Sequence, residues 1–146
     1  MNATELLKNK GLKKTAQRIM LINTLQKKAV SLTENDIKSK MGELYDRVTF
    51  YRTVQILIES EIIHKITVDN ITKYALNNFH ITNTRKNHVH FFCKTCHSIT
   101  CLDRLSPIKY KLPEGFSYDE CEILVKGTCK KCGELYQKKH NRLERI

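Results

Sequence analysis

Apolar residues recur every three or four positions near the start of the chain, which is the spacing of one face of an α-helix. The pattern predicts an amphipathic helix over residues 12–25, with these buried positions: Leu12, Ala16, Ile19, Ile22 and Leu25. An apolar face of this kind needs a partner surface, so we expect the helix to pack against other elements of the same domain.

A second helix follows, and its start can be read from local residues. Thr33 is the predicted N-cap because Asp36, three residues later, completes a capping box. The apolar residues Ile37, Met41 and Leu44 are predicted to face inward.

A third helix is predicted to begin after Asp46, which has the side chain of an N-cap residue. Helical spacing predicts a buried face made of Phe50, Val54, Leu57 and Ile58. The opposite face carries Val48, Arg52, Gln55 and Glu59, with Thr49 and Tyr51 at its margins.

The chain becomes β-rich after residue 61. Residues 62–68 and 71–76 are rich in β-branched side chains and flank Asp69 and Asn70, a two-residue hairpin turn. Three helices followed by a hairpin are the outline of a winged helix. We therefore assign residues 1–78 to a winged helix-turn-helix domain.

The second half of the chain has a different character. Residues 77–87 are polar and contain no carboxylate, and we place a hinge at 79–87. Beyond it, strands are predicted near 89–92, 98–102 and 121–125, and a helical tail over 134–146. The fold class is therefore α+β, with residues 88–146 as a second domain.

Charge and composition narrow the function. The 26 Lys and Arg residues exceed the 15 Asp and Glu residues, which gives a net charge of +11 and favours a polyanionic partner, nucleic acid first. No stretch has the ~20 apolar residues of a membrane span, and lysines interrupt the first residues where a signal peptide has its apolar core. We expect a cytoplasmic protein with no membrane partner.

All six cysteines lie between residues 93 and 132, and four of them form two Cys-x-x-Cys pairs: Cys93, Cys96, Cys129 and Cys132. Two such pairs supply the tetrahedral four-thiolate set that zinc prefers in structural sites. Disulfides and a thioredoxin-like redox pair are the alternatives, and a reducing cytoplasm disfavours both. The spacing predicts a structural zinc site that folds the second domain.

A second metal signal precedes the first pair. His88 and His90 lie on one face of a strand, where both imidazoles can bind one ion. Cys101 and Cys121 lie outside the tetrathiolate set, and lone cysteines are more often buried hydrophobes than ligands. His64 and His140 are interpreted as surface or wing residues.

These motifs together resemble the Fur (ferric uptake regulator) family of bacterial metal-sensing repressors. Residues 11–18 (GLKKTAQR) resemble its opening "GLRxTxQR" segment, and 48–54 (VTFYRTV) resemble its "TVYRTL" recognition helix. Residues 59–63 follow as "ExGLI", although Glu61 replaces the glycine. Residues 88–96 and 127–132 resemble "HxHxxCxxC" and "GxCxxC".

The resemblance implies a winged-helix domain and a C-terminal α/β dimerisation domain with structural zinc. It also implies a homodimer that binds a palindromic double-stranded DNA operator and has no small-molecule substrate. In the family a Tyr-Arg pair contacts the major groove and a basic residue of the opening segment reaches the minor groove. The DNA-binding candidates are accordingly Lys13, Arg18, Thr49, Tyr51 and Arg52.

The regulatory site is where the sequence departs from the family. Ser31 stands where the family has a histidine, and Cys101 where it has an acid. The predicted ligands of a second, regulatory divalent metal are His80, His88, His90 and Cys101. Imidazole and thiolate suit zinc better than iron or manganese, so we expect zinc. Iron or peroxide sensing remains the alternative, because Asp103 or Glu114 would supply a carboxylate.

Functions of other classes find less support. A zinc hydrolase or thiol oxidoreductase is the enzyme alternative, but no HExxH motif, Ser/His/Asp arrangement or glycine-rich phosphate loop is present. A zinc-ribbon RNA-binding module would need exposed aromatic residues, whereas most Phe and Tyr residues here occupy apolar periodic positions. We therefore predict a regulator and not an enzyme.

Overall fold

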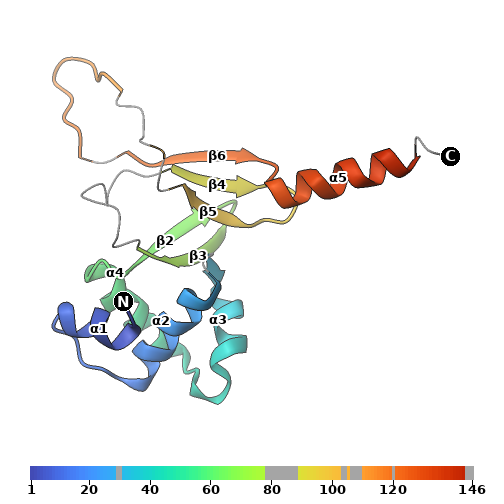
Figure 1. Ribbon diagram of the computed structural model, residues 1–146. Coiled ribbons are helices and arrows are strands. Elements are labelled where there is room, and N and C mark those ends of the chain that lie inside the picture. Colours follow the sequence, from blue (N-terminus) through green and yellow to red (C-terminus); the bar gives the residue numbers. More distant parts are fainter. Residues whose placement is uncertain (29–30, 78–88, 103–104, 106–109, 120, 144–146) are drawn as a thin grey trace. The chain divides into compact units, whose positions relative to one another are not determined.

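A computed structural model covers the chain and describes all residues except 29–30, 78–88, 103–104, 106–109, 120 and 144–146 (Figure 1). The chain divides into two compact units, Met1–Phe79 and His80–Ile146. The predicted hinge at 79–87 lies outside the described residues. None of the helices in the described part is long and apolar enough to cross a membrane.

The first unit packs its helices around one apolar core, beneath a small sheet. The helices are α1 (Ala3–Asn9), α2 (Ala16–Lys28), α3 (Glu34–Met41), the short 3-10 helix η1 (Gly42–Leu44) and α4 (Arg47–Glu59). Ile22, Ile37 and Leu57 are fully buried at the centre of this core. The predicted amphipathic faces of the three central helices therefore meet one another.

The N-terminal helix α1 was not predicted, although its signal is local. Asn2 and Glu5 form a capping box, in which each side chain bonds the backbone N–H of the other residue. Leu6 and Leu7 are buried against the core. The helix α2 begins later than predicted, so Leu12 precedes it, and its partly buried side chain packs against the same core.

The predicted starts of α3 and α4 are confirmed. Thr33 and Asp36 form the capping box of α3, and the Asp46 carboxylate accepts from the Thr49 backbone N–H at 2.8 Å. The inward placement of Leu44 is wrong, because this residue lies in η1 and is 48% exposed. The early end of α3 takes Leu44 off the helical face on which it was predicted.

The predicted hairpin is confirmed as β2 (Ile63–Val68) and β3 (Ile71–Leu76). Asp69 and Asn70 have φ of 49° and 64°, as the two central residues of a tight type I′ turn require. A short strand β1 (Leu32–Thr33) adds to β3, so that the sheet order is β1-β3-β2. The first unit is therefore a winged helix-turn-helix.

The second unit contains a three-stranded sheet of order β5-β4-β6 and a helix. β4 (Val89–Cys93) pairs antiparallel with β5 (Ile99–Leu102) and parallel with β6 (Ile123–Gly127). The third strand lies two residues later than predicted, and α5 (Lys130–Leu143) begins before the predicted residue 134. The predicted α+β class is confirmed.

Helix α4 ends in a Schellman motif that would ordinarily contain glycine. The Glu61 N–H donates to the Ile58 carbonyl and the Ile62 N–H to the Leu57 carbonyl, both at 2.9 Å. Glu61 has φ of 57°, which is the left-handed region that favours glycine. This is the position where the sequence departs from the "ExGLI" pattern.

We predict that Glu61→Gly stabilises the winged-helix unit by about 0.5–1 kcal/mol, because the relief of left-handed strain exceeds the entropy cost of glycine. Urea denaturation followed by circular dichroism measures the change. Glu59→Gly is the control, because Glu59 is the last residue of α4 and the same substitution there is destabilising. Destabilisation by both substitutions would contradict the prediction.

Candidate metal centre and nucleic-acid interface

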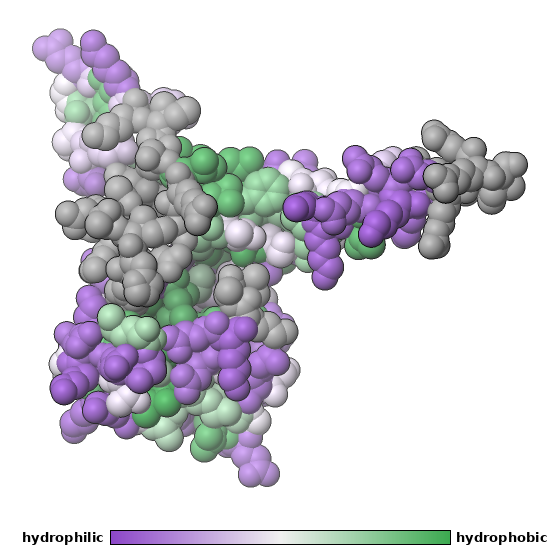
Figure 2. All heavy atoms as spheres, in the orientation of Figure 1, coloured by the Kyte–Doolittle hydropathy of each residue, from purple (hydrophilic) through white to green (hydrophobic). Residues whose placement is uncertain are grey.

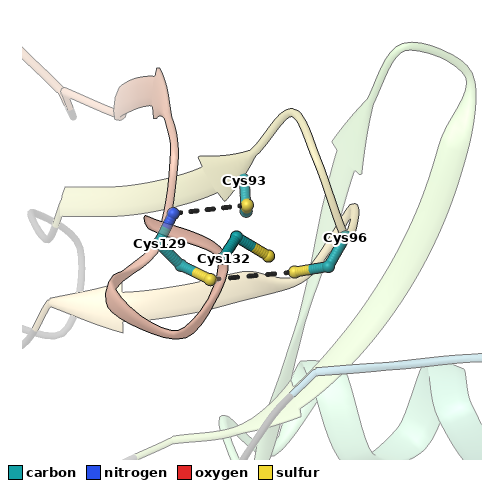
Figure 3. Close-up of side chains that lie close together, drawn as sticks. All are labelled: Cys93, Cys96, Cys129 and Cys132. Carbon is teal, nitrogen blue, oxygen red and sulfur yellow. Dashed lines mark hydrogen bonds between the residues drawn. The ribbon is translucent and has the colours of Figure 1, made fainter. Parts of the chain in front are cut away.

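The four predicted zinc-binding cysteines converge from two distant segments (Figure 3). Cys93 ends β4 and Cys96 lies in the following turn, whereas Cys129 precedes α5 and Cys132 lies in its first turn. Their Sγ atoms all lie within 4.8 Å of one another, and those of Cys96 and Cys129 are 3.9 Å apart. Sulfur atoms about 2.3 Å from one tetrahedral zinc ion lie about 3.8 Å apart. The arrangement fits zinc.

The electrostatics of this cysteine tetrad favour a cation. Backbone N–H groups of Cys96 and Cys129 lower the pKa of Cys93 to about 5. The backbone nitrogen of Cys129 lies 3.3 Å from Sγ of Cys93. The hydrogen bond with Cys129 and burial raise the pKa of Cys132 to about 12. The Cys132 thiol therefore keeps its proton among the crowded sulfurs, and a bound cation would displace that proton. Zinc would supply a closed structural cross-link without an open coordination position.

Backbone contacts hold the cysteine tetrad in place. The His97 N–H donates to the Cys93 carbonyl at 2.8 Å, and the Lys94 N–H donates to the Gly127 carbonyl at 2.8 Å. A Cβ atom at Gly127 would lie 3.2 Å from the Phe91 ring, so a glycine lets β6 approach β4 closely. The sheet thus positions both cysteine pairs.

Two of the predicted regulatory ligands lie side by side on this sheet. His90 in β4 and Cys101 in β5 are register partners, and their ligand atoms lie within 4.8 Å of each other. His90 is buried, with 2% of its surface exposed. His80 and His88 lie outside the described residues.

Glu122 is a candidate ligand that the sequence analysis missed. Its Oε1 lies 3.6 Å from Nδ1 of His90. Glu122 directly precedes β6, and only the parallel pairing of β6 with β4 brings it to this place. His90 on the central strand β4 therefore has a sulfur donor beside it on β5 and an oxygen donor near it from the residue before β6.

The exposed face of α4 is the candidate nucleic-acid interface. Val48, Tyr51, Arg52 and Gln55 are exposed, and their spacing places them on one stripe of the helix. The opposite face is buried, with Phe50 and Leu57 in the core. A helix held in this way presents a narrow polar stripe to a partner, as a recognition helix does.

The other DNA-binding candidates differ in how their polar groups are used. The Thr49 hydroxyl donates to the Asp46 carboxylate at 2.6 Å, within the N-cap of α4. Nη1 of Arg18 donates to the Lys13 carbonyl at 3.0 Å, while the Lys13 side chain is exposed. The Tyr51 hydroxyl donates to Glu34 at 2.6 Å. Lys13 and Arg52 therefore present charge to solvent, whereas Thr49 serves the helix cap.

The chain is similar in sequence to known regulators. A model of the ferric uptake regulator family matches residues 9–125. The ferric uptake regulation protein of Campylobacter upsaliensis is 32% identical over 101 residues, which cover 65% of this chain. The match spans 61% of that relative's length, which is less than two thirds.

Solved structures share the fold. The structure of a zinc uptake regulator complexed with zinc and DNA matches with a TM-score of 0.69 at 18% identity, covering 92% of this chain and 93% of that chain. The Vibrio cholerae ferric uptake regulator matches with a TM-score of 0.59 at 16% identity, covering 86% and 98% respectively. The predicted architecture of a winged helix followed by a second α/β domain is confirmed.

We predict that Cys132→Ser loses one zinc ion per chain and the folded second unit, because structural zinc binding is coupled to folding. Zinc analysis of the purified protein and circular dichroism measure both effects. Cys121→Ser is the control, since this cysteine lies outside the tetrad, and it should retain the zinc. A Cys132→Ser protein with the zinc content of the wild type would contradict the assignment.

Proposed function

The chain belongs to the ferric uptake regulator family, and from this membership we propose that it is a zinc-responsive transcriptional repressor that binds a palindromic operator as a homodimer. The observation that carries the proposal is the exposed stripe of α4 in a winged-helix unit of a chain with a net charge of +11. Family membership favours a regulator over the zinc hydrolase or thiol oxidoreductase alternative.

The stripe on α4 supplies the contacts that DNA recognition needs. Arg52 can donate two hydrogen bonds to a guanine edge, and Val48 offers an apolar contact for a thymine methyl group. Lys13, on the loop before α2, is an exposed cation for the phosphate backbone or the minor groove. Base contacts from α4 would determine which DNA sequence is preferred, and phosphate contacts from the basic surface would supply most of the affinity.

The edge of the second sheet supports a homodimer. Among the described strands, β6 pairs on one side only, with β4. Leu124 and Val125 point to opposite faces of this strand and are 37% and 43% exposed. Figure 2 shows hydrophobic surface gathered over β6. An open edge with apolar side chains on both faces favours cover by a second copy of the chain.

The donor set supports zinc as the regulatory metal. His90 and Cys101 provide nitrogen and sulfur donors, which zinc accepts readily. Iron(II) and manganese sites usually contain carboxylate oxygens instead. Glu122 adds one oxygen donor and is compatible with zinc. We propose that His80 and His88 complete the site. Iron or peroxide sensing would need more carboxylates than these residues supply.

Metal binding would strengthen operator binding through a shift of population. An ion that binds one arrangement of the dimer more tightly than the others raises the population of that arrangement. The size of the effect on DNA affinity equals the difference in metal affinity between the two states. The regulatory site would therefore read free zinc, while the cysteine tetrad keeps its ion throughout.

We predict that Arg52→Ala weakens binding to the duplex that the zinc-loaded wild type selects from a random library by about 1–3 kcal/mol. The loss should be larger for this duplex than for a scrambled one, because Arg52 would read a base edge. Lys138→Ala is the charge-matched control, since Lys138 is exposed on α5 in the second unit. Equal losses for both variants would contradict base reading by Arg52.

We predict that Cys101→Ser abolishes the response of DNA binding to zinc but retains the zinc of the cysteine tetrad. With cobalt in the labile site, the wild type should show a thiolate-to-cobalt charge-transfer band that the variant lacks. Cys121→Ser should keep the band. An unchanged cobalt spectrum in Cys101→Ser would exclude Cys101 as a ligand.

A further inference from the structure

Glu34 on α3 is bonded to the recognition helix. The Tyr51 hydroxyl donates to Oε2 of Glu34 at 2.6 Å, and the Tyr45 hydroxyl donates to Oε1. The capping box of α3 is completed by Thr33 and Asp36, so Glu34 is not needed for the cap. Its carboxylate instead joins the start of α3 to the start of α4.

The Tyr51 ring is fixed although it is 44% exposed. Its edge meets Phe50, with ring centroids 5.3 Å apart at 74°, and the Arg47 guanidinium lies 5.9 Å from its centroid. The bond to Glu34 holds the far end of the side chain. An exposed tyrosine without this anchor would lose rotamer freedom on binding a partner, which costs affinity.

Glu34 also lies where a carboxylate opposes binding to DNA. Together with Tyr51 it lines a groove of about 570 Å³ beside residues of the wing hairpin, among them Lys65, Asn70 and Thr72. The hydrogen bonds from Tyr45 and Tyr51 lower the pKa of Glu34, so the group is ionised. A negative charge beside the recognition stripe repels phosphates whatever the DNA sequence.

We infer that Glu34 is a positioning residue that sets the specificity of the recognition helix: it orients Tyr51 for cognate DNA, while its charge weakens binding to every duplex. The inference rests on the proposed function. Anchoring favours the one duplex that fits the fixed ring, whereas charge repulsion acts on every duplex. The ratio of cognate to non-cognate affinity is therefore the quantity that Glu34 controls.

Glu34→Ala and Glu43→Ala test the inference as a matched pair. Glu43 is an exposed glutamate of η1, so both variants remove one negative charge from the winged-helix unit. The probes are the duplex that the wild type selects from a random library and a scrambled duplex of equal length. Glu34→Ala should lower the affinity ratio about five-fold, and Glu43→Ala should leave it unchanged. Equal ratios for the two variants would overturn the inference.

A double-substitution cycle shows whether Glu34 acts through the Tyr51 hydroxyl. Tyr51→Phe should lower the ratio, and adding Glu34→Ala to Tyr51→Phe should lower it no further. Independent, additive losses would overturn the positioning role. Thermal unfolding of each variant checks the fold. A wild type that selects no sequence from the library overturns the proposed function and this inference together, whereas successful selection with equal ratios overturns the inference alone.

Discussion

Four sulfur atoms brought together from two distant segments are the constraint on which the second unit depends. Thiols so close cannot all ionise without a cation. Backbone N–H groups lower the pKa of Cys93, whereas the hydrogen bond with Cys129 and burial raise the pKa of Cys132. A zinc ion would allow all four thiols to ionise by accepting all four thiolates. The cross-link would then join the end of β4 to the start of α5, which are separated by more than thirty residues.

The regulatory candidates depend on the same framework. β4 carries His90 three residues before its last residue, Cys93. The neighbouring strand β5 brings Cys101 beside His90, and Glu122, the residue before β6, lies near its ring. In the proposed function, a closed tetrathiolate site would hold its ion permanently, while the mixed-donor site nearby would exchange its ion. One sheet would then support two metal sites with different ligand sets.

Local signals in the sequence predicted much of the fold, whereas features that depend on contacts between distant segments were not predicted. The two helix caps and the hairpin turn each depend on residues at most three positions apart, so their roles can be read from the sequence. They are formed by Thr33, Asp46 and the Asp69-Asn70 pair. The spacing of the cysteine pairs likewise identified the tetrad. Glu122 was missed because its place depends on a parallel pairing across about thirty residues, for which periodicity gives no register. The bond from Glu34 to Tyr51 joins two helices and leaves no periodic trace.

The most direct test of metal-dependent repression is to measure zinc content, molecular mass and operator affinity on one sample before and after mild chelation. We expect chelation to remove one zinc ion per chain and to leave the second ion and the dimer in place. Affinity for the selected duplex should fall about ten-fold or more until zinc is restored. Unchanged affinity after loss of the labile ion would contradict this expectation.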